Sequence, residues 1–196
     1  MTKTRGPWTV HGERTVFESP WMQVREFEVT QPDGKPGVYG VMSPRNLALA
    51  ILPVHADGTV TLVGQHRFPL DRYSWEIPEG GGPLGEDALD GARRELKEET
   101  GLTADHWHEI LQLDLSNSIT DERAIGYLAT GLHPGEPEPE GTEVLLTRSP
   151  HFLDALDEAM SGQITDALTV AMLLRAYYMA QQGLLAAGLA DVMLRR

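Results

Sequence analysis

The sequence predicts a mixed fold of the α/β or α+β class, in which one helix interrupts a set of strands and further helices close the chain. Three patterns indicate it. Alternating segments rich in β-branched and aromatic residues fill the first 78 residues. One helical pattern lies between glycine-rich punctuation near residue 82 and Gly101. A long apolar helical pattern follows Asp166.

The strands follow from period-two alternation bounded by turn residues. The apolar run at 47–54 is expected to be buried on both faces. "QPDGKPG" at 31–37 and "HADG" at 55–58 predict turns, and the Pro, Gly and Glu residues of 133–143 predict an exposed loop. The predicted strand regions are 8–31, 38–42, 47–54, 59–68, 73–78, 107–115, 124–132 and 144–148.

The helices follow from apolar spacing and from residues typical of helix ends. The central helix is expected to begin near Glu86 or Asp87 and to end at Gly101. A second helix is expected after Ser149-Pro150, and a long one from Asp166, interrupted at Gly183 and Gly188. We expect residues 1–45 to form a separate β segment, either a small sheet or an arm, and residues 46–196 to form the main domain.

Composition excludes several classes of protein. The chain has 196 residues, a formal net charge of −13 and no cysteine, which leaves no thiolate metal site, nucleophile or disulfide framework. The acidity argues against nucleic-acid binding and against anionic membranes. No apolar run approaches the length of a membrane span and the N-terminus lacks a secretory pattern, so we expect a cytoplasmic protein.

The negative charge is concentrated around the central helix. Between Glu76 and Glu109 there are ten acidic and three basic residues, a net charge of −7. At 100° per residue Glu95, Glu98 and Glu99 lie on one arc of the helix. Such carboxylates repel one another unless a cation lies between them. A hard divalent cation such as Mg²⁺ takes oxygen ligands and shares its coordination with phosphates. The alternative is a solvated acidic face.

The same segment resembles the Nudix box, G-x5-E-x7-R-E-U-x-E-E-x-G-U with U a bulky aliphatic residue. Every fixed position of that pattern is present. The matching residues are Gly80, Glu86 and Arg94-Glu95-Leu96-Lys97-Glu98-Glu99-Thr100-Gly101-Leu102. A full match of this length favours the metal site over the acidic surface, and it implies a Nudix-type α/β/α sandwich with a mixed sheet.

The resemblance implies Mg²⁺, with Mn²⁺ as an alternative, bound by the box. Glu95 and Glu99 would be metal ligands, together with the backbone carbonyl of Glu79. Glu98 would be a further ligand or a partner of Arg94, and it is also a candidate catalytic residue. Metals there would neutralise a diphosphate and acidify a bound water.

The wider chain is similar to the ADP-ribose pyrophosphatase branch of that family. The similarity is carried by "QHRFPLDRYSWEIPEGG", "SITDER" and "SGQITDALTVAMLLRA". It implies that Arg67 contacts substrate phosphate and that Glu122, on a mobile loop, is the general base. We predict Arg72, in the first of these stretches, as a second substrate-binding residue.

The resemblance implies hydrolysis of a nucleoside diphosphate sugar, with ADP-ribose giving AMP and ribose 5-phosphate. Asn117 stands where the branch typically has a proline, which keeps GDP-mannose and other sugar nucleotides open as substrates. A pyrophosphatase that sanitises the nucleotide pool and a non-catalytic nucleotide-sugar sensor are further alternatives. Members of the branch are usually homodimers whose N-terminal segments help to build the partner's site, a role that would suit Trp8, Trp21 and Phe27.

Overall fold

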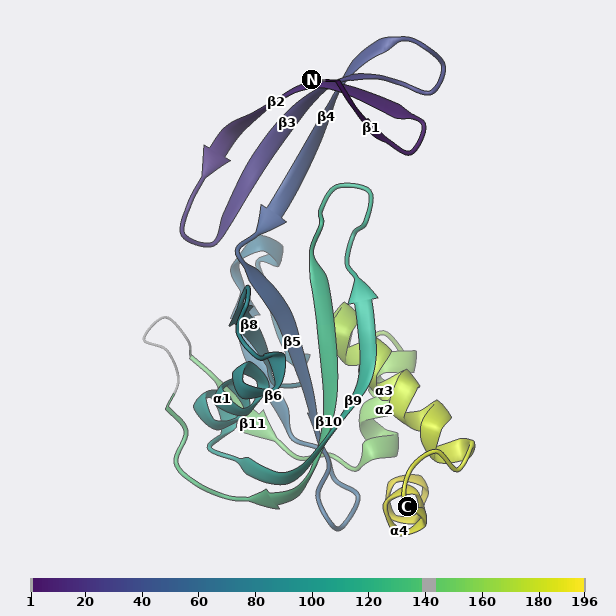
Figure 1. Ribbon diagram of the computed structural model, residues 1–196. Coiled ribbons are helices and arrows are strands. Elements are labelled where there is room, and N and C mark those ends of the chain that lie inside the picture. The colour runs from purple at the N-terminus through teal and green to yellow at the C-terminus, as the bar shows by residue number, and fades with distance from the viewer. Residues whose placement is uncertain (1, 139–143, 196) are drawn as a thin grey trace. The chain divides into compact units, whose positions relative to one another are not determined.

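The computed structural model describes residues 2–138 and 144–195, which fall into two compact units (Figure 1). The N-terminal unit comprises Met1–Leu47 and Leu113–Arg123, and the main unit comprises Ala48–Gln112 and Ala124–Arg196. The predicted loop at 133–143 lies partly outside the described residues; residues 134–138 have no regular secondary structure.

The N-terminal unit is a four-stranded sheet in the order β1-β2-β3-β4, with antiparallel neighbours. The predicted turn at 31–37 is present but shorter, because β4 already begins at its sixth residue. Gly34 supplies the positive φ of this turn (φ 86°). On one face the side chains of Phe27 and Val29 are buried. The strands are β1 (Lys3–Arg5), β2 (Trp8–Glu18), β3 (Met22–Thr30) and β4 (Pro36–Pro44).

The main unit contains two sheets. The first is mixed and has the order β8-β5-β10-β9, with β5 and β10 parallel, and the second is antiparallel with the order β11-β6-β7. A 3-10 turn, Phe68–Leu70, joins β6 to β7. The strands are β5 (Asn46–Pro53), β6 (Leu62–Arg67), β7 (Arg72–Glu76), β8 (Glu79–Pro83), β9 (Thr103–Asp114), β10 (Arg123–His133) and β11 (Leu146–Arg148).

Alternation along β10 shows how helices cover both faces of the mixed sheet. Tyr127 and Ala129 pack with Leu96 of α1 in one buried cluster. Gly126 faces the other side, where a Cβ would come within 3.1 Å of the Met172 Cε atom of α3. Two helices therefore pack on opposite faces of one sheet (Figure 1). The helices are α1 (Ala88–Thr100), α2 (Phe152–Met160), α3 (Ala167–Gln181) and α4 (Ala187–Leu194).

Three details refine or correct the sequence predictions. The sequence predicts no strand at the glycines that precede the central helix, but residues 79–83 form strand β8, which pairs with β5. The helix α2 follows Ser149-Pro150 as predicted, although Pro150 precedes its N-cap, His151, whose Nδ1 accepts the Leu153 N–H at 3.2 Å. The long C-terminal helix is interrupted near Gly183 as predicted, but Gly188 lies inside α4.

Candidate active site

The box helix α1 is fixed at both ends by its own residues. At the start, the Asp87 side chain accepts the backbone N–H groups of Leu89 and Asp90. At the end, Gly101 adopts the left-handed conformation (φ 72°) and its N–H bonds to Lys97 O. These are the predicted boundaries of the helix. The register of the box carboxylates on α1 is therefore determined within the helix itself.

The carboxylates of the box lie on the partly buried side of α1. Glu99 is 4% exposed. The side chains of Glu95 and Glu98 are 12% and 25% exposed. A solvated acidic face would be far more exposed than this. The structure therefore contradicts the alternative that these residues are merely surface charges.

Arg94 ties this helix to strand β8. Its Nη1 donates to Glu98 at 2.6 Å, and its Nη2 donates to Glu95 at 2.7 Å and to the Gly81 carbonyl at 2.9 Å. The predicted pair between Arg94 and Glu98 is thus present. Burial alone would lower the pKa of Arg94, but the charges and hydrogen bonds of Glu95 and Glu98 outweigh it and raise the pKa. One guanidinium orients two box carboxylates.

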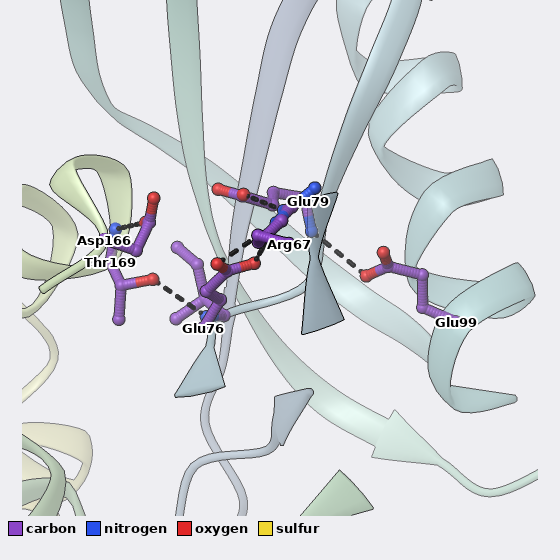
Figure 2. Close-up of polar contacts among 7 residues, drawn as sticks. Arg67, Glu76, Glu79, Glu99, Asp166 and Thr169 are labelled. Carbon is purple, nitrogen blue, oxygen red and sulfur yellow. Dashed lines mark hydrogen bonds and ion pairs between the residues drawn. The ribbon is translucent and has the colours of Figure 1, made fainter. Parts of the chain in front are cut away.

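The backbone at the start of β8 runs directly beside the other box carboxylates. The Glu79 N–H donates to Glu99 Oε2 at 3.1 Å (Figure 2). At Gly80 a Cβ would come within 2.5 Å of Glu95 Oε1, closer than real Cβ atoms approach other atoms. The glycine therefore lets the strand lie against Glu95. The structure brings together the predicted metal ligands Glu79, Glu95 and Glu99.

A second group of charges lies on the other side of this strand end, around Arg67. Arg67 Nε and Nη2 donate to the Glu76 carboxylate at 2.6–3.1 Å, and Nη2 also forms an ion pair with Glu79 (Figure 2). Glu76 is 3% exposed. Burial alone would lower the pKa of Arg67, but the hydrogen bond to Glu76 and the charges of Glu79 and Glu76 raise it above its ordinary value. Arg67 therefore stays charged.

The negative charge that surrounds the Glu79 side chain exceeds the single positive charge of Arg67. Burial, and then repulsion from Asp166, raise the pKa of Glu79 well above its ordinary value, although Arg67 opposes this. Its Oε2 atom is buried without a hydrogen-bond partner among the described residues. Carboxylate oxygens of Glu76, Glu79 and Asp166 lie within 4.8 Å of one another. The carboxyl group of Glu79 thus lies in a strongly negative environment.

Sequence reasoning missed Glu76, Asp166 and Thr169 as parts of this site. Asp166 caps α3, because its Oδ2 accepts the Thr169 N–H at 2.7 Å. Thr169 is fully buried, and its hydroxyl accepts the Ile77 N–H at 3.0 Å (Figure 2). Ile77 lies between the two glutamates that bind Arg67. The N-terminus of α3 is therefore fastened to the segment that carries Glu76 and Glu79. The sequence offered only indirect signals: Glu76 stands in "WEIPEG", next to the box, and Asp166 and Thr169 stand in "SGQITDALTVAMLLRA", a stretch that carries the family similarity.

The donor set fits the divalent ion that the box implies. Side-chain carboxylates of Glu95 and Glu99 and the backbone of Glu79 offer hard oxygen atoms. Mg²⁺ and Mn²⁺ prefer such ligands, whereas softer metals favour nitrogen or sulfur.

Two further predicted site residues, Arg72 and Glu122, have other partners. Arg72, at the start of β7, donates from Nη2 to Thr165 Oγ1 at 2.9 Å. Glu122 belongs to the N-terminal unit, where its N–H donates to Thr120 Oγ1 at 3.1 Å. Burial raises the pKa of Glu122. The roles predicted for Arg72 and Glu122 stay predictions.

The aromatic residues of the N-terminal unit have three different environments. Phe27 is buried, Trp21 is 75% exposed, and Trp8 meets Tyr39 edge to face at 5.4 Å between ring centroids. Trp8, Phe27 and Tyr39 line a hollow of about 230 Å³ together with Arg5, whose guanidinium lies 4.5 Å from the Phe27 ring centroid.

Comparison with known proteins agrees with these observations. A family model described as the NUDIX domain matches residues 44–163, and one described as the nucleoside diphosphate sugar hydrolase N-terminal domain matches residues 8–42. The ADP-ribose pyrophosphatase of Bacillus subtilis (strain 168) is 33% identical over 156 residues, which are 79% of this chain and 84% of that protein. That of Mycobacterium tuberculosis (strain ATCC 25618 / H37Rv) is 33% identical over 133 residues, 66% of this chain and 64% of that protein.

A solved structure shares the fold. The chain described as "Crystal structure of ADP compounds hydrolase" superimposes with a TM-score of 0.80 and 23% identity, over 91% of this chain and 97% of that one. Among the described residues, no helix combines the length and apolarity needed to cross a membrane. The predicted fold class and the resemblance of the box are confirmed. Since the NUDIX model covers more than half of the sequence and the box helix presents its carboxylates to β8, this chain belongs to the Nudix hydrolase family.

Proposed function

We propose that this chain hydrolyses the diphosphate bond of a nucleoside diphosphate sugar, with ADP-ribose as substrate and AMP and ribose 5-phosphate as products. The observation that carries the proposal is the convergence of Glu95, Glu99 and the Glu79 backbone at one place. The names of the B. subtilis and M. tuberculosis relatives support ADP-ribose.

In this proposal Glu95, Glu99 and the Glu79 carbonyl hold Mg²⁺ or Mn²⁺. A bound divalent ion neutralises the diphosphate and lowers the pKa of a water molecule. Glu98 keeps the Arg94 guanidinium in place, and Arg94 in turn orients Glu95. The ligands are thus held in position before substrate arrives.

Arg67 and Arg72 are proposed to bind the phosphate groups. The Arg67 side chain is 34% exposed, so it remains accessible to an anion while Glu76 and Glu79 fix its direction. An arginine held in this way binds phosphate with little loss of side-chain entropy. Glu122 is proposed as the general base that removes a proton from the attacking water.

Residues 1–45 are proposed as a dimerisation and substrate arm of a cytoplasmic homodimer. The hollow lined by Trp8, Phe27 and Tyr39 supports contact with the base of a nucleotide, because flat aromatic walls favour stacking. Asn117 stands where the branch typically has a proline. Other sugar nucleotides, such as GDP-mannose, are therefore the second candidate substrates.

The test is a substrate panel. Wild-type protein with Mg²⁺ or Mn²⁺ is incubated with ADP-ribose, GDP-mannose and UDP-glucose, and products are separated by ion-exchange chromatography. Formation of a nucleoside monophosphate and a sugar phosphate is the expected result. The control is the Glu99→Gln variant, which should form neither at a comparable rate. A folded wild-type protein that cleaves no member of the panel would refute the proposal.

A further inference from the structure

The segment that carries Glu122 is bound to the edge of the N-terminal sheet. The Met42 N–H on β4 donates to the Ile119 carbonyl at 2.9 Å, and Met42 and Thr120 form a parallel bridge. The Tyr39 hydroxyl donates to the Ser118 carbonyl at 2.6 Å. Residues 118–120 thus extend the sheet beside β4. All of these residues belong to the same compact unit.

A polar cluster fastens the next residue, Asp121. Its Oδ2 accepts the Ser43 hydroxyl at 2.9 Å and Arg25 Nη2 at 3.1 Å, and Arg25 Nη2 also lies 3.1 Å from Ser43 Oγ. Ser43 is 5% exposed, and the Arg25 guanidinium lies 5.4 Å from the Phe27 ring centroid. Two polar groups, one from each of the neighbouring strands β3 and β4, therefore converge on one carboxylate oxygen of Asp121.

The strength of this cluster comes from its buried members. The Asp121 side chain is 54% exposed, so its ion pair with Arg25 alone would contribute little. Ser43, however, is buried, and its hydroxyl would lose its acceptor if Asp121 moved away. Arg25 would likewise lose a charged partner. The cluster thus favours one position of Asp121 over a freely moving loop.

Glu122 follows Asp121 directly and is itself held on both sides. Its N–H donates to Thr120 Oγ1 at 3.1 Å, and its carbonyl accepts the Leu115 N–H at 2.9 Å. A shift of Asp121 would therefore be transmitted to Glu122 through a single peptide unit. Displacing a reacting group by about 1 Å can reduce the reaction rate about 100-fold.

We propose that Arg25, Ser43 and Asp121 are positioning residues for the reaction, through which the N-terminal sheet sets the position of Glu122. This rests on the proposed function, and in particular on Glu122 as the base. It gives the N-terminal unit a part in the turnover rate besides any contact with substrate.

The experiment is a double-mutant analysis of turnover. Ser43→Ala and Asp121→Asn are each made in the wild type and in Glu122→Gln, and kcat, KM and the Mg²⁺ activation constant are measured. In the wild type we expect each substitution to lower kcat about 10-fold, which is less than the effect of a full 1 Å displacement. KM and the Mg²⁺ activation constant should stay within about twofold of the wild-type values. In Glu122→Gln neither should lower kcat further, because the group that they position is already gone.

Glu26→Gln is the matched control. It removes another ion pair of the same sheet, between Arg14 and Glu26 at 2.6 Å, in which no residue of 113–123 takes part. It should leave kcat at the wild-type value. Hydrogen exchange provides a second readout: the Ile119 to Glu122 amides should exchange faster in Ser43→Ala than in Glu26→Gln.

The outcomes separate the two proposals. Wild-type kcat in both Ser43→Ala and Asp121→Asn, or equal losses with and without Glu122, would overturn the positioning role while the proposed function stands. Unchanged exchange of the loop amides in Ser43→Ala would also overturn it. A Glu122→Gln variant with normal kcat would remove the base assignment and the positioning role together. Failure of the wild type on the substrate panel would refute the function itself.

Discussion

Gly80 offers a direct test of the proposed metal site. A Cβ added there would lie 2.5 Å from Glu95 Oε1 and closer still to Cδ and Oε2, whereas ordinary contacts begin near 3.4 Å, so the carboxylate must withdraw by about 1 Å or more. The backbone at Gly80 does not have a positive φ, so the Gly80→Ala variant introduces no conformational strain. The clash falls on the end of a flexible side chain. The fold should therefore survive, while a metal ligand is displaced.

The expected effect follows from that displacement. Misplacement by about 1 Å can cost about 100-fold in rate, so Gly80→Ala should lower kcat about 100-fold and require more Mg²⁺ for half-maximal activity. Its melting temperature in a chelating buffer should stay within a few degrees of the wild type. The assay is a Mg²⁺ titration of ADP-ribose hydrolysis, combined with thermal unfolding without metal.

Two other glycines serve as matched controls. In Gly82→Ala, on the same strand, the Cβ would meet Leu49 Cδ1 at 2.8 Å, so stability should fall by about 1–3 kcal/mol from overpacking while metal activation changes little. In Gly188→Ala nothing lies within 4 Å, and neither property should fall. Wild-type Mg²⁺ activation and turnover in Gly80→Ala would refute the assignment of Glu95 as a ligand beside the backbone of β8.

Three further variants test other parts of the site. Thr169→Val should lower the free energy of unfolding by about 1–3 kcal/mol and reduce kcat, because the Ile77 N–H loses its acceptor. Thr169→Ser should retain most of the stability and of kcat. Equal losses in the two variants would contradict a role for the hydroxyl. A general base works when it is deprotonated, and burial raises the pKa of Glu122. We therefore expect kcat/KM to rise with pH through a value above 4.5. This rise at acidic pH should be absent in Glu122→Gln. Glu99→Gln should reduce kcat by orders of magnitude. Its melting temperature without metal should equal or exceed that of the wild type, because a repelling charge is removed. Normal turnover would exclude Glu99 as a ligand.

The local parts of this site were predictable from sequence, because they depend on short spacing. The ends of α1 follow from Asp87 and Gly101, and the pair of Arg94 with Glu98 follows from a separation of one helical turn. The strand at 79–83 was not predicted, since glycines have low strand propensity and here form a strand by pairing with β5. Tertiary pairing outweighed local preference.

The cluster around Arg67 could not be predicted from the sequence, for a different reason. Asp166 lies 90 positions after Glu76, and as a helix cap it carries no signal of proximity to another carboxylate. The anchor of Asp121 to Ser43 spans 78 positions in the same way. Such contacts depend on how strands and helices pack, which spacing in one sequence does not reveal.

The balance of charge at this site favours the binding of a cation. Six carboxylates, those of Glu76, Glu79, Glu95, Glu98, Glu99 and Asp166, lie around two guanidinium groups, Arg67 and Arg94, which leaves a formal charge of −4. Burial and, after it, repulsion from neighbouring carboxylates disfavour ionisation here, and together they raise the pKa of Glu79. Uptake of a proton by Glu79 relieves only one of these charges, whereas each divalent ion relieves two. Two divalent ions would cancel the formal charge of −4 and remove the repulsion of a polyanionic diphosphate, so metal binding and substrate binding should be strongly coupled here.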